Sequence, residues 1–461
     1  MKKNRSMILL IALLTVALCV LVVVATLLDP SGQEENNDPS TQPSLETTPS
    51  TKPTETEPPP TTQPTEPPIV KEATATIGAT GDILFHDLVI QSGYNSATGT
   101  YNYDEIFPFF SQYVSKMDYA VANLEVTLCG SDNGYAYKGY PCFNSPDAVA
   151  DALKKAGFDM LLTANNHSYD TRNVGFLRTQ QVIKDRGLDY IGTRTDPNDA
   201  NYIVKDINGI KVGMVCYTYN TQQDENGKIY LNGIPLTVED SKLVNSFNYY
   251  QLDSFYSRLS GQLAEMKSLG AEATVLFIHW GDEYQTTPNS HQTKMAQALC
   301  DLGIDVIMGN HAHVPQPVEL LTSKEDENHK TLCLYSTGNS ISNIYETSKF
   351  PVNTEDGMLF SFTFAKYSDG TVVVESADVL PTWVWRSYDE NWVRKFTVLT
   401  MDDDVEDWQS AMNLPDEQLQ ECKDSYKRTM DIVGPGLTAA NEWFAQNQAT
   451  VEAQLGVEIA G

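Results

Sequence analysis

The sequence has few basic residues and no pair of cysteines at Cys-x-x-Cys spacing. It carries 31 lysine and arginine residues against 61 aspartate and glutamate residues, for a formal net charge of −30. The phosphates of a nucleic acid need a basic protein surface, so this composition argues against a nucleic-acid partner. It also argues against tight binding to an anionic membrane surface. Without a Cys-x-x-Cys pair, a zinc-finger site is not expected.

Residues 29–71 contain almost no large apolar side chains. The tract is rich in threonine, proline, serine and glutamate, as in TKPTETEPPP over residues 51–60. A segment that cannot bury apolar surface does not fold by itself. We therefore predict a disordered stalk over residues 29–71.

Residues 1–28 predict a membrane anchor. Lys2, Lys3 and Arg5 precede an apolar run over residues 7–28. At about 1.5 Å per residue, this run can cross a hydrocarbon core of roughly 30 Å. Basic charge on the N-terminal flank alone places that end in the cytoplasm and the rest of the chain outside. The alternative is a cleaved signal peptide, whose apolar core is usually shorter, and no convincing small-x-small cleavage site precedes the acidic tract. We predict an uncleaved, single-pass signal anchor in the cell membrane, with the C-terminal domain extracellular.

An exported chain permits disulfide bonds without requiring them. Cys129 and Cys142 bracket a loop rich in glycine, aspartate and tyrosine, and they form the most plausible pair. Cys216, Cys300 and Cys333 lie inside apolar runs and are expected to be buried free thiols.

Helical and strand patterns alternate along the chain from residue 72. The expected strands and hairpins cover residues 74–84, 119–128, 158–163, 188–192, 202–219, 273–278, 306–308, 330–335 and 358–379. This alternation predicts an α/β domain over residues 72–394, with a substantially parallel sheet and added antiparallel hairpins. Residues 395–461 are punctuated by Pro415 and by Gly434-Pro435-Gly436, and they are expected to form a small helical C-terminal appendage or a cap packed on the main domain.

Polar side chains follow the expected strands at or near their ends. The most informative stretch is residues 305–319, where a buried strand stops at Gly309 and is followed by His311 and His313. A loop after a strand end can turn both imidazoles toward one centre. The other candidates are Asp82, Glu125, Asn166, His167 and His279. In open α/β sheets, ligands bind at the carboxyl ends of strands, so we expect these residues to meet.

Two carboxylates, an amide oxygen and several imidazoles form a mixed oxygen and nitrogen donor set. Such a set suits Mn, Fe or Zn better than Ca or Mg, and it predicts one or two divalent transition-metal ions. Two cations that share a bridging carboxylate clamp a phosphoryl group and generate hydroxide for in-line attack. His167 is the candidate general acid or hydrogen-bond donor, and Asp170 is a candidate for orienting an imidazole.

Six short motifs make the chain resemble a known family. They are GD (81–82), NLE (123–125), ANNHSYD (164–170), HWGDEY (279–284), GNHAHVPQPVE (309–319) and YSTGN (335–339). Together they resemble the CapA/PgsA family, which is tied to poly-γ-glutamate capsule synthesis within the calcineurin-like metallophosphoesterase superfamily. The resemblance covers roughly residues 74–345. It implies a metallophosphoesterase-like sandwich of two mixed sheets flanked by helices.

The resemblance also implies a role for each candidate. Asp82 resembles the first-strand aspartate, and Glu125 stands where a bridging aspartate usually stands. The Asn166-His167 pair is similar to the superfamily's ligand and catalytic helper. The resemblance makes His279 an isolated ligand, and it makes His311 and His313 a closing pair with one histidine for each metal.

Three departures from the superfamily pattern bear on the metal count. Leu84 occupies the histidine position of the first Asp-x-His motif, and His86 lies two residues further on. A glutamate replaces the bridging aspartate, and Asn310 is inserted in the closing Gly-His-x-His motif. We therefore expect one metal position to be weak or empty.

Two main functions follow as hypotheses. The first is a membrane-anchored extracellular hydrolase or transferase that acts in making, attaching or exporting an anionic polymer of the poly-γ-glutamate type. The second is a non-catalytic capsule-assembly factor with a structural or vestigial metal site. Both imply the capsular polymer or its biosynthetic membrane complex as partner. A phosphoesterase acting on other wall or nucleotide substrates is a third reading.

Overall fold

The computed structural model describes residues 69–222 and 227–454. The predicted anchor over residues 1–28 and nearly all of the predicted stalk lie outside these ranges. Within the two described ranges, no helix combines the length and the apolar character that a bilayer crossing requires.

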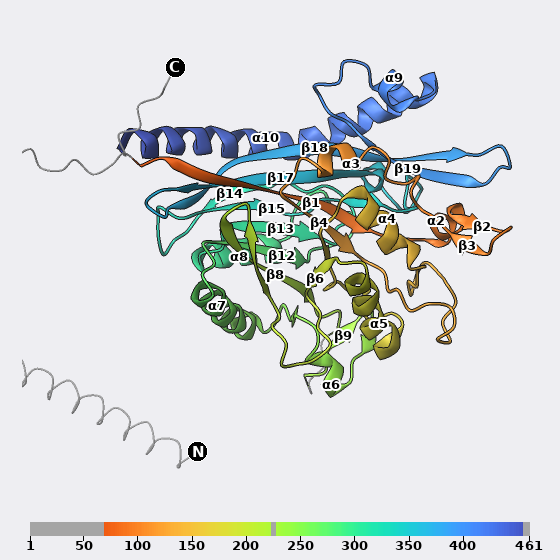
Figure 1. The fold of residues 1–461 in the computed structure, drawn as a ribbon, viewed down its shortest axis with the longest axis horizontal. Coiled ribbons are helices and arrows are strands. Elements are labelled where there is room, and N and C mark those ends of the chain that lie inside the picture. Colours follow the sequence, from red (N-terminus) through yellow and green to blue (C-terminus); the bar gives the residue numbers. More distant parts are fainter. Residues whose placement is uncertain (1–68, 223–226, 455–461) are drawn as a thin grey trace, which may run out of the picture. The chain divides into compact units, whose positions relative to one another are not determined.

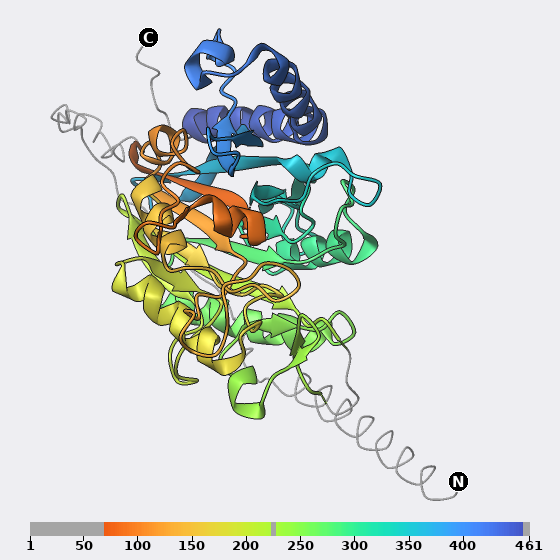
Figure 2. The ribbon, with the colours of Figure 1, turned by 90° about the vertical axis from the view of Figure 1, so that its right-hand side faces the viewer.

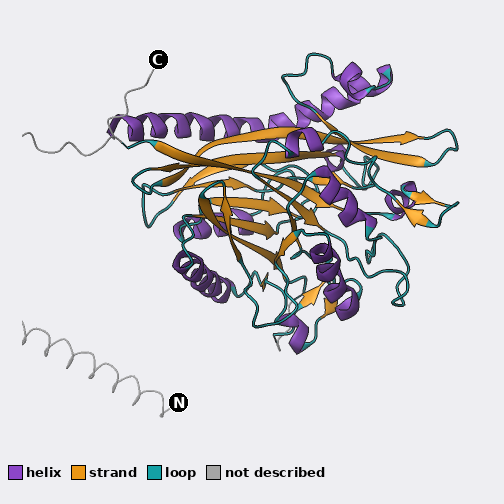
Figure 3. Cartoon of the chain, viewed as in Figure 1, coloured by secondary structure: helices purple, strands orange, loops and turns teal. Residues whose placement is uncertain are grey.

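The first sheet contains eight strands and is mixed (Figures 1 and 3). Its strands are β1 (Lys71–Ile83), β4 (Tyr119–Leu124), β5 (Met160–Leu162), β6 (Asp189–Ile191), β16 (Asn339–Ile341), β17 (Asp356–Tyr367), β18 (Val372–Tyr388) and β19 (Arg394–Thr400). The order is β19-β18-β17-β1-β4-β5-β6, and β16 pairs with the end of β1. The strands from β1 to β6 run parallel, whereas β17, β18 and β19 add antiparallel pairs.

The second sheet contains seven strands and is also mixed. Its strands are β7 (Ile203–Ile207), β8 (Ile210–Tyr219), β11 (Ser246–Phe247), β12 (Ala273–His279), β13 (Val306–Asn310), β14 (Val318–Thr322) and β15 (Lys330–Leu334). The hairpin from β7 to β8 lies within the range 202–219 expected from the sequence, and it turns at Asn208 and Gly209. Their φ angles of 53° and 89° fit the two positive values that a type I′ turn requires.

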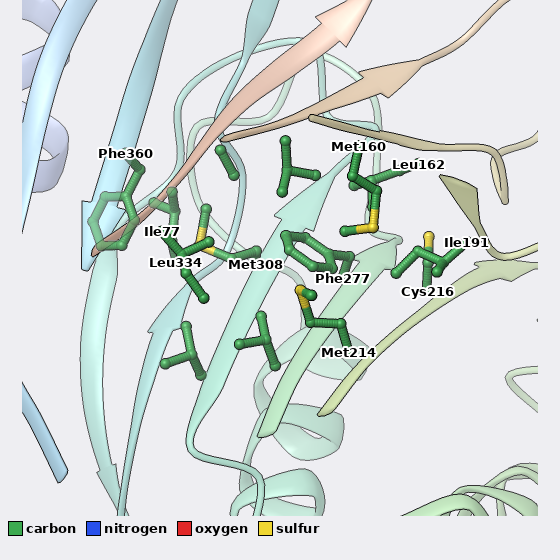
Figure 4. Close-up of a cluster of buried hydrophobic side chains, with 14 of the residues drawn as sticks. Ile77, Met160, Leu162, Ile191, Met214, Cys216, Phe277, Met308, Leu334 and Phe360 are labelled. Carbon is green, nitrogen blue, oxygen red and sulfur yellow. The ribbon is translucent and has the colours of Figure 1, made fainter. Parts of the chain in front are cut away.

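The main core lies between the two sheets (Figure 4). Ile77 and Met160 from the first sheet pack in the same cluster as Met214, Phe277 and Met308 from the second. Side chains alternate faces along a strand, so neighbouring residues of these strands face outward and need their own cover. Two mixed sheets with helices on their outer faces confirm the predicted α/β sandwich.

Helices cover the outer faces of both sheets (Figures 1 and 2). On the first sheet, α4 (Ala148–Ala156) contributes Val149 and Leu153, and α5 (Arg172–Asp185) contributes Val182. On the second sheet, α7 (Leu252–Ser268) and α8 (Ser290–Asp301) bury residues such as Phe255 and Met295. The shorter elements are α2 (Asp87–Ser92), β2 (Tyr94–Asn95), β3 (Thr100–Tyr101), α3 (Ser111–Val114), β9 (Tyr230–Leu231), β10 (Ile234–Pro235), α6 (Val238–Ser241), η1 (Val352–Glu355) and α9 (Trp408–Met412).

The predicted C-terminal appendage is wrong in its boundary and its internal stops. Residue 395 falls inside β19, which pairs with β18 in the first sheet. The helix α10 (Asp416–Gln454) continues through Gly434-Pro435-Gly436. Packing overrides the local helix-breaking tendency here, because Gly436 lies directly against β14, where an added Cβ would come within 1.8 Å of the Val318 carbonyl oxygen. Figure 1 shows α10 lying along β18.

A buried ion pair also ties α10 to the first sheet. Asp356, at the start of β17, is fully buried. Its carboxylate accepts hydrogen bonds from Arg428 Nη2 at 2.6 Å, Arg428 Nε at 2.8 Å and Ser425 Oγ at 2.6 Å. The C-terminal helix is therefore an integral part of the domain.

The suggested disulfide between Cys129 and Cys142 is wrong, and both residues are free thiols. The Cys129 backbone is fixed by the side chain of Asn144, whose Oδ1 accepts the Cys129 N–H at 2.8 Å. Cys142 instead packs against the core between the sheets. Cys216, Cys300 and Cys333 are buried and free, as predicted.

Candidate metal centre

Strands from both sheets bring the predicted polar residues together. In the first sheet, Asp82 lies at the end of β1 and Glu125 directly follows β4. In the second sheet, His279 ends β12, and His311 and His313 follow β13. All five side chains are at most 4% exposed. The centre is therefore a buried contact between the carboxyl ends of strands from two different sheets.

Asp82 is held from several directions. Its Oδ1 accepts a hydrogen bond from Asn123 Nδ2 at 2.7 Å. Its Oδ2 lies 2.9 Å from His313 Nδ1 and 3.3 Å from the His311 backbone N–H. Burial alone would raise the pKa of Asp82, but the hydrogen bond and charge of His313 lower it overall. Asp82 is thus an anchored carboxylate.

Glu125 has the opposite surroundings. Its side chain is fully buried, and its Oε1 has no hydrogen-bond partner among the described residues. Burial raises the pKa of Glu125 well above its usual value, and the nearby Asp82 adds to the effect. A buried carboxylate oxygen without a hydrogen-bond partner is costly, so the position suits a cation.

The surroundings favour the neutral form of His279 and His311 but not that of His313. His279 Nε2 lies 2.7 Å from Asn166 Oδ1 and 3.4 Å from Glu125 Oε1. Burial lowers the pKa of His279 to about 3 and that of His311 well below its usual value. Burial also opposes a charge on His313, but the hydrogen bond that its Nδ1 donates to Asp82 raises the pKa of His313 overall. Neutral imidazole is the form that binds metal ions.

The loop that carries the two histidines is strained. His311 and His313 have φ angles of 96° and 57°. Residues other than glycine rarely adopt such φ angles, which cost on the order of 1–3 kcal/mol each. Hydrogen bonds hold the loop in place, from Tyr284 N to the Ala312 carbonyl at 2.7 Å and from Asn339 Nδ2 to the His313 carbonyl at 3.1 Å. Such strain is typical of functional loops.

The donor set fits one or two metal ions. Ligand atoms of Glu125, His311 and His313 lie within 4.8 Å of one another, and so do those of Asp82, Glu125 and His279. Glu125 belongs to both groups, which is the position of a bridging ligand. Glu125 Oε1 and His311 Nδ1 are buried without a hydrogen-bond partner among the described residues, as expected for atoms kept for a cation.

Of the two ligands expected from the first Asp-x-His motif, the chain keeps only the aspartate, Asp82. Leu84 is buried, and its backbone N–H donates to the Ile341 carbonyl at 2.8 Å. His86 Nδ1 accepts the Asn343 backbone N–H at 3.2 Å, and its ring packs edge-on against Phe143. His86 belongs to neither of the two ligand groups. It therefore does not replace the histidine that Leu84 displaces.

His167 and Asp170 form a pair beside the centre. His167 Nδ1 lies 2.7 Å from Asp170 Oδ2, and that oxygen also accepts the Phe143 N–H at 2.6 Å. Asn232 Nδ2 donates to Asp170 Oδ1 at 2.8 Å and to the Pro141 carbonyl at 2.6 Å. Asp170 therefore fixes the ring of His167 and holds a proton on its Nδ1.

Three asparagines outside the predicted ligand set complete the centre. Asn123 bonds Asp82, Asn339 Oδ1 lies 3.1 Å from His313 Nδ1, and Asn232 holds Asp170. Asn123 lies in β4, two residues before Glu125 in the NLE motif, and its place in that motif could have identified it. Asn232 comes from a short hairpin far from Asp170 in sequence, and no local pattern points to it.

Gly309 lets the strand before the histidine loop approach its neighbour closely. An added Cβ would lie 1.9 Å from the Tyr335 carbonyl oxygen and 2.6 Å from Trp280 Nε1. We expect Gly309→Ala to lower the free energy of unfolding by about 1–3 kcal/mol, because backbone cannot yield to the methyl group. Gly261→Ala in α7 is the control. No heavy atom lies within 4 Å of its added Cβ, so it should stabilise by about 0.5–1 kcal/mol. Urea denaturation measures both, and equal effects would contradict the close approach.

Comparison with known proteins agrees with the resemblance read from the motifs. A capsule biosynthesis protein CapA from Bacillus anthracis is 26% identical over 258 residues, covering 55% of this chain and 58% of the relative. A PGA biosynthesis protein CapA from Bacillus subtilis strain 168 is 26% identical over 282 residues, covering 60% of this chain and 65% of the relative. The matched region thus spans less than two thirds of either relative.

Among solved structures, a candidate 5′-nucleotidase from Staphylococcus aureus in complex with alpha-ketoglutarate matches with a TM-score of 0.40 and 13% identity. The match covers 74% of this chain and 58% of that chain. This superposition is too loose to transfer a fold or an activity. The family comparison is firmer, because residues 76–344, more than half of the chain, match the family described as bacterial capsule synthesis protein PGA_cap. The chain belongs to this family.

Proposed function

We propose that the chain is a membrane-anchored, extracellular protein that acts in making, attaching or exporting an anionic capsular polymer of the poly-γ-glutamate type. Family membership and the names of the two Bacillus relatives support the link to capsule. The basic flank and apolar run of residues 1–28 support the location. The polymer, or the membrane complex that makes it, is the proposed partner.

We further propose a metal-dependent hydrolase or transferase site. One observation carries this proposal: Asp82, Glu125, His279, His311 and His313 converge from two sheets with two of their buried ligand atoms left unpartnered among the described residues. Asn166 adds an amide oxygen to the set. The mixed donor set suits Mn, Fe or Zn. When bound, such a cation supplies Lewis acidity and lowers the pKa of a coordinated water.

The chain's own residues provide the proton transfer. Asp170 accepts a hydrogen bond from His167 Nδ1, so that Nε2 is the nitrogen left to take or give a proton. The Phe143 N–H and Asn232 Nδ2 hold the two carboxylate oxygens of Asp170. This fixes the imidazole before a substrate arrives, which is how a general acid or base is positioned.

A specific observation favours the second candidate, a non-catalytic assembly factor. Leu84 is buried in place of the superfamily's histidine, and His86 does not replace it. Losing one ligand weakens one metal position. In this reading the remaining ions hold the two sheets together while the surface recruits polymer or enzyme partners.

Asp170→Asn separates the two functions. An amide cannot hold the His167 proton on Nδ1 as the carboxylate does, so the variant should keep its metal and lose turnover by about 10–100-fold. In cells deprived of their own copy, we expect the wild-type chain to restore surface poly-γ-glutamate and the variant to restore little. The measurements are polymer per cell and metal per purified chain.

Asp185→Asn is the control for that experiment, because this residue lies on the same stretch of chain but on the exposed end of α5. It should restore the capsule like the wild type. Full capsule with Asp170→Asn at wild-type protein levels would contradict the catalytic proposal and support the assembly factor. Loss of metal in the variant would instead show that Asp170 supports the ligands.

A further inference from the structure

A cavity over β8 and β11 of the second sheet is lined, among the described residues, by three cations and by no carboxylates. It has a volume of about 370 Å³ and is bounded by Arg194, Lys242, Arg258 and Tyr217. An adjoining cavity of about 180 Å³ shares Arg258 and adds Lys228. Among the described lining residues of both cavities there is no aspartate or glutamate. In a chain with a net charge of −30, this is a local reversal of charge.

The cations of the cavity have no carboxylate partner in the described part of the chain. Arg258 donates to Ser254 Oγ at 3.0 Å and to the Ser246 carbonyl at 2.8 Å, and Arg194 donates to Asn245 Oδ1 at 3.3 Å. Arg194 Nε is buried and has no hydrogen-bond partner among the described residues. Elsewhere Arg178, Arg186 and Arg428 each bind a carboxylate.

This arrangement points to a bound anion. Arg194 is partly buried, whereas Lys242 and Arg258 are exposed, and none of the three forms an ion pair in the described part of the protein. The planar guanidinium group of an arginine that is free of such a pair suits an oxyanion, which it binds through two parallel hydrogen bonds. Ser246 and Asn245 add neutral polar groups to the same wall. A carboxylate or a phosphate satisfies this chemistry.

The cavity adjoins the metal centre through a single strand. Tyr217 lines the cavity, and Tyr219, two residues later on β8, has its ring centroid 4.8 Å from that of His311. Residues two apart on a strand face the same side and lie about 7 Å apart. Ser246, which also lines the cavity, lies on β11 and pairs with Thr218, the residue of β8 between Tyr217 and Tyr219. The segment with α6 and β9 lies at this end of the second sheet (Figure 1).

We propose that this cavity binds carboxylate groups of the acidic polymer, through Arg194, Lys242 and Arg258, and so holds the polymer next to the metal centre. The identity of the polymer rests on the proposed function. The positive charge of the cavity would offset the electrostatic repulsion between an acidic protein and a polyanion.

The test measures binding of a fluorescently labelled, γ-linked glutamate oligomer to the full-length chain by anisotropy at low ionic strength, where screening is weak. Lys242→Gln/Arg258→Gln should weaken binding by about tenfold, since each removed cation loses charge-assisted hydrogen bonds. The matched control is Lys267→Gln/Lys294→Gln. It changes the net charge equally, at exposed positions outside both cavities, and should change binding by less than about twofold.

A second pair, Lys228→Gln/Lys242→Gln, keeps the test valid if loss of the Arg258 hydrogen bonds disturbs folding. It should also weaken binding beyond the control. Equal weakening by cavity and control variants, or no binding by the wild type, would overturn the proposal. Binding of polyphosphate without binding of the glutamate oligomer would overturn the carboxylate assignment.

The outcome is separable from that of the proposed function. If Asp170→Asn restores full capsule while the cavity variants still lose the oligomer, the catalytic proposal fails and the binding cavity stands.

Discussion

Glu125→Gln should stabilise the metal-free protein and abolish its metal binding. The glutamine keeps the shape of the side chain but removes a buried carboxyl group whose ionisation is unfavourable beside Asp82 and which has an unpartnered oxygen. We expect the free energy of unfolding without metal to rise by about 1–3 kcal/mol. Metal affinity should fall by at least about 100-fold, because an amide is a weaker ligand than a carboxylate. Urea denaturation with a chelator measures the first effect, and calorimetric titration with Mn or Zn measures the second.

Glu319→Gln is the control for this pair of effects. Glu319 is exposed and accepts a hydrogen bond from the Tyr335 hydroxyl at 2.7 Å, away from both ligand groups. Its substitution should change stability by less than about 0.5 kcal/mol and leave metal binding unchanged. A loss of metal-free stability in Glu125→Gln would show that the carboxylate already has a stabilising partner inside the protein.

Arg428→Met should destabilise the whole domain, although it lies in the C-terminal helix. The substitution leaves the fully buried Asp356 carboxylate without its partner, which costs about 3–5 kcal/mol. Adding Asp356→Asn should recover most of the loss, because the second change removes the uncompensated charge. Urea denaturation of the single and double variants measures the coupling.

Lys427→Met serves as the neighbouring control. Lys427 pairs with Asp431 one helical turn away, and both side chains are more than half exposed. Such surface pairs contribute little, so we expect a change below about 0.5 kcal/mol. Equal losses from Lys427→Met and Arg428→Met would mean that helix charge, rather than the buried pair, sets the stability.

Local patterns predicted most of the sandwich. The run from Val306 to Met308, the turn at Asn208 and Gly209, and the helix ended by Gly157 all carry their signal within a few residues. The six motifs placed the candidate ligands at strand ends, and the structure brings them together. Family membership is confirmed by the match over residues 76–344.

Long-range packing explains what local patterns missed. The helix α10 runs through Pro435 because the sheets hold it on both sides of that residue, and β19 is a strand because β18 offers it a partner. The short β16 gains its place by pairing with the end of β1. Asn232 reaches Asp170 across 62 positions of sequence. None of these partners can be read from neighbouring residues.

If the chain binds a metal as proposed, the division of the ligands between the two sheets makes metal supply a determinant of folding. Asp82 and Glu125 belong to one layer, and His279, His311 and His313 to the other. Only the assembled sandwich presents all five, so the native state binds the ion and the unfolded chain does not. By mass action, free metal at 100 times its dissociation constant adds about 2.7 kcal/mol to stability. Scarcity of the ion would therefore lower the fraction of the chain that is folded.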